Sequence, residues 1–285
     1  MNPKELLDLL TLEQLDNNLF RGSNQDIGNA AVFGGQLLGQ AMAAAGETVD
    51  GYDVHSMHAY FLRTGDLTKP IIYDVERVRD GRTFCTRRVV AIQNGKRIFF
   101  LSASFQKTEE GFSHQVEMPK VPSPEELPCE SGLRLSMAET LPPERRDFYT
   151  IMRPVEMRPI YPDDLWEHSD KPAEQGFWIR INTQLPNSSM LHRALLAYTS
   201  DYYFMGTALR PHGVRFSTHN LMVTSLDHAM WFHQEFRMDE WILYMMDSPA
   251  SSNARGLNFG KFYRRDGTLV ASCVQEGLSR IKNEG

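Results

Sequence analysis

Asp201 is the residue whose type and sequence neighbours indicate a chemical role most directly. It lies in the segment LLAYTSDYYF, where its neighbours are apolar or aromatic. Transfer of a carboxylate into apolar surroundings costs free energy unless the group is hydrogen-bonded, so such a residue often has a task. The alternative interpretation is an ordinary acid at the end of a helix. We take Asp201 as a candidate general base.

Two further polar side chains follow in the same half of the chain. Gln275 ends the apolar run ASCVQ, and a buried amide offers both a donor and an acceptor to a water molecule. Ser225 begins the run SLDH and could orient the same water through its hydroxyl. A covalent Ser225 nucleophile is a weaker hypothesis, because a G-x-S-x-G elbow is missing and adjacency in sequence is not triad geometry. As structural residues, Gln275 and Ser225 would only satisfy hydrogen bonds in the core.

The histidines raise the question of a metal site. His55 and His58 are three residues apart on what reads as a strand, where successive side chains point to opposite faces. No nearby acid completes a ligand set for these two histidines together with His228 and His233. We therefore expect no metal and no cofactor. His58 remains a candidate for binding substrate at the junction of two repeats.

Basic side chains form a second group of candidates. Arg87, Arg88 and Lys96 flank one predicted hairpin, and Arg255 lies in SSNARG. Charges on a strand usually form a solvated face, but arginine can also hold phosphate groups in a bidentate manner. We predict that some of these four residues contact the phosphates of a nucleotide-bearing substrate.

The elements that must position these residues occur twice. Two stretches of 52 residues, 55–106 and 224–275, each end in strand-like alternation closed by a glutamine. An apolar helix-like segment precedes each, and the repeat predicts one duplicated unit. Gln106 is then the structural counterpart of Gln275, and Ala43 takes the place of Asp201. The loss of the acid in the first copy indicates that only the second kept a reactive site.

Local patterns predict a helix followed by antiparallel strands in each half, an α+β arrangement. Helices are expected over residues 5–20 and 34–49, the second crossed closely by neighbouring backbone at Gly35 and Gly39. Asn94-Gly95 and Asp266-Gly267 indicate hairpin turns. A proline-rich connector should separate the halves and carry a short helix near 132–141. The expected boundaries are 1–110, 111–172 and 173–285.

Composition sets broad limits. The chain has 285 residues, a net charge of −6 and three cysteines without metal-type spacing. The acidic balance argues against unspecific nucleic-acid binding, and the lack of a long apolar run against membrane insertion. No secretory signal is recognised at the N-terminus, and cysteine usage fits a reducing compartment. We expect a cytoplasmic location.

The motifs together resemble one family. The stretches VFGGQLLGQA, HSMHAYFLRTGD, KPIIYDVE, AIQNGK, DHAMWFH and VQEG, in this order and over residues 5–282, are similar to acyl-CoA thioesterase II. The resemblance implies a double hotdog fold, in which each unit is a long helix wrapped by a curved antiparallel sheet. It implies hydrolysis of fatty acyl-CoA to free acid and CoA. The missing peroxisomal tail favours a bacterial type.

The resemblance also implies roles for residues. The family's Asp, Thr or Ser, and Gln fall on Asp201, Ser225 and Gln275, with Thr224 as the alternative hydroxyl if the register slips by one. Acyl-CoA and CoA are the implied partners, and a homodimer or homotetramer is expected. Two other functions stay open: an acyl-CoA binding module without catalysis, and a hotdog enoyl-CoA hydratase, for which His58 is the candidate histidine.

Overall fold

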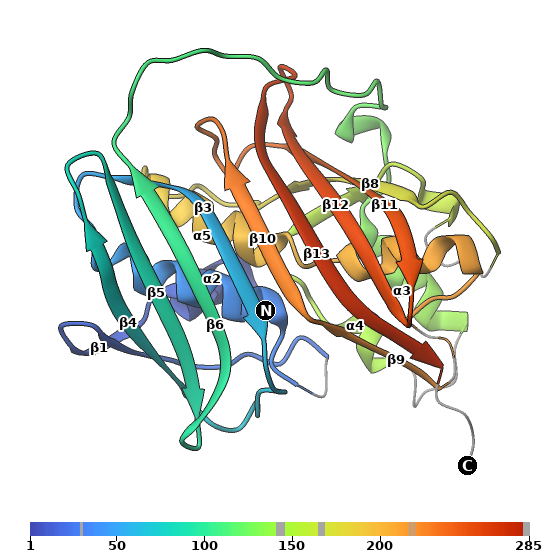
Figure 1. Ribbon diagram of the computed structural model, residues 1–285. Helices are drawn as coiled ribbons and strands as arrows, with labels where there is room; N and C mark the ends of the chain where they lie inside the picture. The colour runs from blue at the N-terminus through green and yellow to red at the C-terminus, as the bar shows by residue number, and fades with distance from the viewer. Residues whose placement is uncertain (29–30, 141–145, 165–168, 217, 219, 282–285) are drawn as a thin grey trace.

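In the computed structural model (Figure 1) one antiparallel sheet runs through the whole molecule. The structure describes residues 1–285 except 29–30, 141–145, 165–168, 217, 219 and 282–285. Its strands follow the order β1-β2-β4-β5-β6-β3-β10-β13-β12-β11-β8-β7, with β9 paired to β13. The helices α2 and α5 lie together behind this sheet in Figure 1. The double hotdog expected from the motifs is confirmed by its structural relatives, which are described below.

The N-terminal half begins with a short helix and a hairpin and then builds its unit. Its elements are α1 (Pro3–Leu10), β1 (Glu13–Asp16), β2 (Leu19–Gly22), α2 (Gly34–Gly46), β3 (Asp53–Phe61), β4 (Ile71–Asp80), β5 (Phe84–Gln93) and β6 (Lys96–Gln106). Strand β4 buries Ile71, Tyr73 and Val75 at alternate positions, as its sequence predicts for a half-buried strand.

The C-terminal half repeats the plan with additions. It comprises β8 (Glu174–Arg180), α5 (Ser189–Thr199), the 3-10 helix η4 (Phe204–His212), β9 (Leu221–Ser225), β10 (Asp227–Phe232), β11 (Ile242–Ser252), β12 (Arg255–Arg264) and β13 (Leu269–Ile281). Both predicted hairpin turns have a glycine with positive φ, Gly95 at 69° and Gly267 at 89°. A residue with a Cβ would be strained in either place.

The connector passes over the ends of the central strands (Figure 1) and then packs on the second half. It carries η1 (Pro124–Glu126), α3 (Glu130–Thr140), α4 (Asp147–Thr150), β7 (Glu156–Pro159) and η3 (Pro162–Asp164). The expected helix near 132–141 is therefore present as α3. Strand β7 pairs with β8, so the sheet of the second half takes one strand from within residues 111–172.

The two halves meet in the sheet and in the helix layer. Strand β3 pairs with β10, which places Met57 opposite Met230 at the junction. Helices α2 and α5 cross so closely that a Cβ on Gly35 would lie 2.2 Å from the Tyr198 carbonyl oxygen. A Cβ on Gly39 would lie 3.2 Å from that of Ala194. The close approach expected at these glycines is therefore made by the other helix, rather than by the sheet.

Two helix predictions are wrong in their extent. The helix expected over 5–20 ends at Leu10, because Thr11 caps it and residues 13–22 form the hairpin β1–β2. The helix expected over 34–49 ends at Gly46. The apolar spacing of Leu12 and Leu15 matched a helix by chance, whereas Asn17 and Asn18 form the turn between β1 and β2.

The repeat alignment that paired Gln106 with Gln275 is also wrong. Gln275 is fully buried and faces the helices, whereas Gln106 is partly exposed and donates to Glu109. Gln106 is thus displaced by an odd number of residues from the positions of β6 that face the helices, and a shift of one residue along a strand turns a side chain to the opposite face. The buried positions of β6 toward its C-terminal end are Leu101, Ala103 and Phe105.

Candidate active site

Asp201 lies where the two helices meet. Helix α5 ends at Thr199 with Ser200 as its C-cap, so Asp201 follows the helix rather than lying within it. Its Oδ2 accepts a hydrogen bond of 2.9 Å from the backbone N–H of Gly35, in the first turn of α2. A Cβ on Gly34 would lie 2.6 Å from the same oxygen, so only glycine leaves room for it. The sequence placed the site in the C-terminal half alone, but the N-terminal half contributes this donor.

The amide of Gln275 joins the other two candidates. Its Nε2 donates to Oδ1 of Asp201 at 3.1 Å and to the hydroxyl oxygen of Ser225 at 2.6 Å. Strands β9 and β13 bring these residues together, because Ser225 is paired with Gly277, two positions beyond Gln275. The structure thus gathers all three predicted residues around one amide nitrogen. Thr224, the alternative hydroxyl, is exposed.

Burial and hydrogen bonding shift the pKa of Asp201 in opposite directions. Burial raises the pKa of its carboxyl group above the usual 3.8, while hydrogen bonds from Gln275, Gly35 and Ser225 oppose the rise. The start of α2 adds a positive dipole end, which favours an ionised carboxylate. An aspartate held in this way can accept a proton more readily than an exposed one.

His228 belongs to the same cluster, although the sequence raised it only as a metal ligand. It is fully buried, and its Nδ1 is 2.7 Å from Oε1 of Gln275. Its Nε2 is 3.0 Å from the hydroxyl oxygen of Ser200. Burial lowers the pKa of His228 to about 4, so the ring is neutral near pH 7. The only signal in the sequence is the alternation of DHAMWF, which puts His228 on one face with Met230 and assigns it no role.

The counterpart of Asp201 is not Ala43. The helices run antiparallel, because Gly35 at the start of α2 meets Tyr198 near the end of α5, while Gly46 at the end of α2 meets Met190. The place that corresponds to Asp201, just past the end of α5, is therefore at the end of α2 near Gly46. Asp201 lies two residues past Thr199, and the residue two past Gly46 is Thr48, while the neighbouring Glu47 is exposed. The conclusion that the buried acid is missing from the first copy is therefore unchanged.

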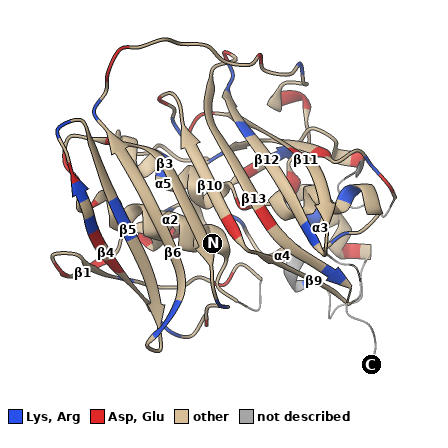
Figure 2. Ribbon diagram, in the orientation of Figure 1, with Lys and Arg blue, Asp and Glu red and all other residues tan. Residues whose placement is uncertain are grey.

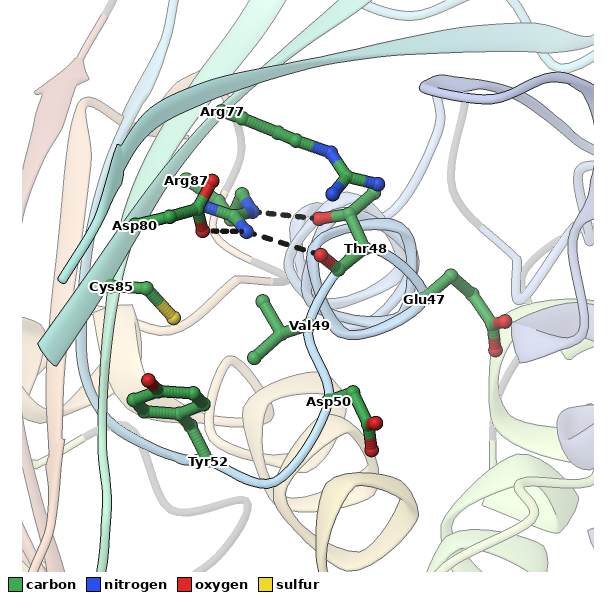
Figure 3. Close-up of a pocket in the computed structure, with 9 residues that line it drawn as sticks. All are labelled: Glu47, Thr48, Val49, Asp50, Tyr52, Arg77, Asp80, Cys85 and Arg87. Atoms are coloured by element: carbon green, nitrogen blue, oxygen red, sulfur yellow. Dashed lines mark hydrogen bonds and ion pairs between the residues drawn. The ribbon is translucent and has the colours of Figure 1, made fainter. Parts of the chain in front are cut away.

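Arg87 and Arg88 do not form one cluster, because neighbouring strand residues face opposite ways. Arg87 is buried, and it donates to Thr48 and pairs with Asp80 at 2.5 Å in the cavity of about 380 Å³ shown in Figure 3. Arg88 is exposed and lies over the Phe100 ring on the outer face. The guanidinium of Arg87 is thus occupied by protein groups, which argues against the predicted phosphate contact.

The other predicted binding residues are dispersed. Lys96 is exposed at the turn after β5, and Arg255 pairs with Glu276 at 2.9 Å beside a cavity of about 300 Å³. His58 is exposed on the outer face of β3, with its ring at the edge of Trp231. Figure 2 shows basic and acidic segments interspersed over the strands of both halves, not one continuous basic surface.

No metal site emerges from the residues that the structure describes, since they include no group of three or more His, Cys, Asp or Glu suited to hold an ion. The ring nitrogens of three histidines instead meet hydroxyl groups: His55 is 2.8 Å from Ser104 and His233 is 2.9 Å from Ser272, while His228 meets Ser200. None of the described helices is long and apolar enough to cross a bilayer.

Comparison with family models adds independent evidence. Residues 21–106 match the model described as the acyl-CoA thioesterase N-terminal domain. Residues 146–278 match the model described as acyl-CoA thioesterase. The two matched stretches contain the first unit and nearly all of the second.

Individual relatives agree over almost the full length. The chain is 41% identical to acyl-CoA thioesterase 2 of Haemophilus influenzae, over 97% of each protein. It is 41% identical to human acyl-coenzyme A thioesterase 8, over 96% of this chain and 88% of the human protein. Among solved structures, acyl-CoA thioesterase II TesB2 of Mycobacterium marinum superposes with a TM-score of 0.80, 40% identity and 99% coverage of both chains. A tesB protein of Mycobacterium avium gives a TM-score of 0.82 at 28% identity, over 98% and 100% of the two chains.

Proposed function

This chain belongs to the acyl-CoA thioesterase family, and we propose that it hydrolyses fatty acyl-CoA to a free fatty acid and CoA at Asp201, Ser225 and Gln275. The observation that carries the proposal is the shared amide: one nitrogen of Gln275 contacts both the carboxylate and the hydroxyl. A water bound beside these three groups would have an acceptor for its proton and partners that fix its orientation.

Hydrolysis of a thioester needs a proton acceptor for the attacking water, and it replaces the C–S bond by a C–O bond. Asp201 takes a proton from the water as the water oxygen attacks the thioester carbonyl carbon. The C–S bond then breaks, the acid forms, and the proton held by Asp201 passes to the leaving CoA thiolate, which restores the carboxylate. The Ser225 hydroxyl orients the water and needs no covalent acyl intermediate, because both ring nitrogens of His228 are engaged with Gln275 and Ser200 rather than with Ser225.

The negative charge that develops on the carbonyl oxygen requires a positive partner. The helix start that lies beside Asp201 is that of α2, since Gly35 donates to the carboxylate. N–H groups in the first turn of a helix favour negative charge. We therefore place the reacting carbonyl beside the start of α2.

The test is release of the CoA thiol from palmitoyl-CoA by the purified chain. The variant Asp201→Asn should lower kcat roughly a hundredfold or more, as for the loss of a general base. Because the pKa of Asp201 is raised, the acid limb of kcat/KM should lie above pH 3.8 and should be absent from the residual rate of the variant. The variant Asp74→Asn, on the exposed side of β4, serves as a control. Wild-type turnover by Asp201→Asn would refute the assignment.

Two rival functions make different predictions in the same assay. An acyl-CoA binding module would bind the ester without releasing thiol. A hydratase would need a histidine at the acyl chain, and His58 is exposed on the outer face while Asp201 faces α2. The homodimer or homotetramer and the cytoplasmic location stay predictions.

A further inference from the structure

Both ring nitrogens of His228 are within hydrogen-bond distance of a polar side chain, so the ring has a fixed orientation. Its Nδ1 contacts Gln275, its Nε2 contacts Ser200, and Ser200 is bonded covalently to Asp201. Because Gln275 in turn donates to Asp201, the four residues form a closed ring of contacts. Tyr244 fixes the ring further by donating to the Ser200 carbonyl oxygen at 2.7 Å.

The orientation of the Gln275 amide decides whether the site can form. Its nitrogen carries two hydrogens, which match the two acceptors Asp201 and Ser225. If the amide were rotated by half a turn, its oxygen would face the carboxylate, and both groups would be acceptors. The amide therefore needs a donor at Oε1 that holds the productive orientation.

His228 can supply that donor in one tautomer. A neutral imidazole carries one N–H, and the amide oxygen only accepts, so the hydrogen is at Nδ1. Nε2 is then an acceptor. The Ser200 hydroxyl lies 3.0 Å from Nε2 and 2.8 Å from the Ala197 carbonyl oxygen, and in this tautomer its one hydrogen is directed to Nε2. A ring that is fixed at both nitrogens cannot rotate to offer Gln275 an acceptor instead.

On this basis, which rests on the proposed function, we infer that His228 is a positioning residue that locks the Gln275 amide with its nitrogen toward Asp201 and Ser225. Its effect on the reaction passes through Gln275, since its own nitrogens are both used. A misplaced group near the reacting atoms can cost about a hundredfold in rate, and groups that hold active residues in place often matter nearly as much as the residues they hold.

Two substitutions separate orientation from packing. His228→Leu keeps a buried side chain but removes the donor, and we expect kcat to fall about tenfold to a hundredfold with KM changed less than about threefold. His228→Asn places an amide N–H near the former Nδ1, and kcat should recover to within about fivefold of the wild type. His233→Leu is the matched control, because His233 also bonds a serine hydroxyl, at 2.9 Å, but is exposed.

The outcomes are measured together with Gln275→Ala by thiol release, with circular dichroism to confirm folding. A slow His228→Leu and a recovered His228→Asn support the inference. Wild-type kcat in His228→Leu overturns it, as does equal loss in the Leu and Asn variants; a slow Gln275→Ala would leave the proposed function standing in either case. Wild-type kcat in Gln275→Ala overturns both. If His228→Leu fails to fold, Ser200→Ala replaces it: a fall in kcat of several-fold supports the inference, and an unchanged kcat overturns it.

Discussion

The two halves share a fold but differ in what faces the helices at the junction strands. In the N-terminal half, the buried positions of β3 and β6 beside the junction include Met57, Ala59 and Ala103, all apolar. In the C-terminal half, the corresponding strands β10 and β13 bury His228 and Gln275. One half of the sheet therefore supplies an apolar core where the other supplies a hydrogen-bonded polar cluster.

If the proposed function holds, this difference explains how a duplicated fold can carry one reactive centre. Buried polar groups cost free energy unless every donor and acceptor is matched. In the second half that matching is provided by a ring of contacts and by one N–H from Gly35 of the first half. The first half keeps the apolar packing and donates a helix start, so the halves are specialised and not redundant.

The largest expected effect comes from removing the amide. Gln275→Ala should lower kcat for palmitoyl-CoA by about a hundredfold or more, as for the loss of a preorganised donor. Gln106→Ala, at the glutamine that ends the matching sequence stretch of the N-terminal half, should stay within about twofold, because that side chain is partly exposed and bonds Glu109. Equal losses at the two positions would mean that both halves are reactive.

A second effect concerns stability and pH. The pKa of His228 is lowered from 6.5 to about 4, so below pH 6.5 the unfolded chain binds a proton that the folded chain does not. The free energy of unfolding should fall by up to about 3 kcal/mol between pH 6.5 and 4 from this group. Urea titrations of the wild type and His228→Asn should differ in this pH range. The N-terminal control His55→Asn should change the profile less, since His55 is partly exposed.

A third comparison uses the two glycines of α2. Gly35→Ala places a Cβ 2.2 Å from a backbone oxygen of α5, and forced overpacking of this kind costs about 1–3 kcal/mol. Gly39→Ala meets a flexible side-chain carbon of Leu10 at 2.9 Å, and the helix propensity of alanine offsets part of the cost by about 1 kcal/mol. Chemical denaturation should rank Gly35→Ala as the less stable, and the reverse ranking would contradict the role of close helix contact.

The smallest effect is expected at the basic residues. Arg255→Ala, in the half that carries Asp201, should raise KM for palmitoyl-CoA less than about threefold, because exposed ion pairs contribute little. Lys96→Ala, on the far hairpin of the other half, should leave KM unchanged. Steady-state kinetics at low ionic strength would detect a larger electrostatic role for either.

Much of this arrangement could be predicted from the sequence. Hairpin turns at Asn94-Gly95 and Asp266-Gly267 and alternation in β4 depend on local chemistry, so the predictions succeed there. The residues Asp201, Ser225 and Gln275 were found through an acid in apolar surroundings and through the family resemblance. Register was the failure: the pairing of Gln106 with Gln275 assumed equal repeat lengths, whereas strand register is set by cross-strand pairing over long separations.

The contributions of His228 and Gly35 could not be read from the sequence. A histidine in an apolar strand gives the same sequence pattern whether it binds a metal, fills a core or holds an amide. Only its contacts in the structure distinguish these roles. The N–H of Gly35 is a backbone group 166 residues away from Asp201, and no side-chain pattern indicates such a contact.

The exposed arch between β6 and α3 has one more consequence. Residues 107–117 are all exposed and arch over the ends of the strands (Figure 1). Gln115 holds this tether to the second half through Gly267 and Leu269. Free units of unlike sequence could associate like with like, and such pairs would lack either the carboxylate or its helix-start donor. A covalent tether enforces a one-to-one stoichiometry of unlike units, so every molecule carries one complete centre.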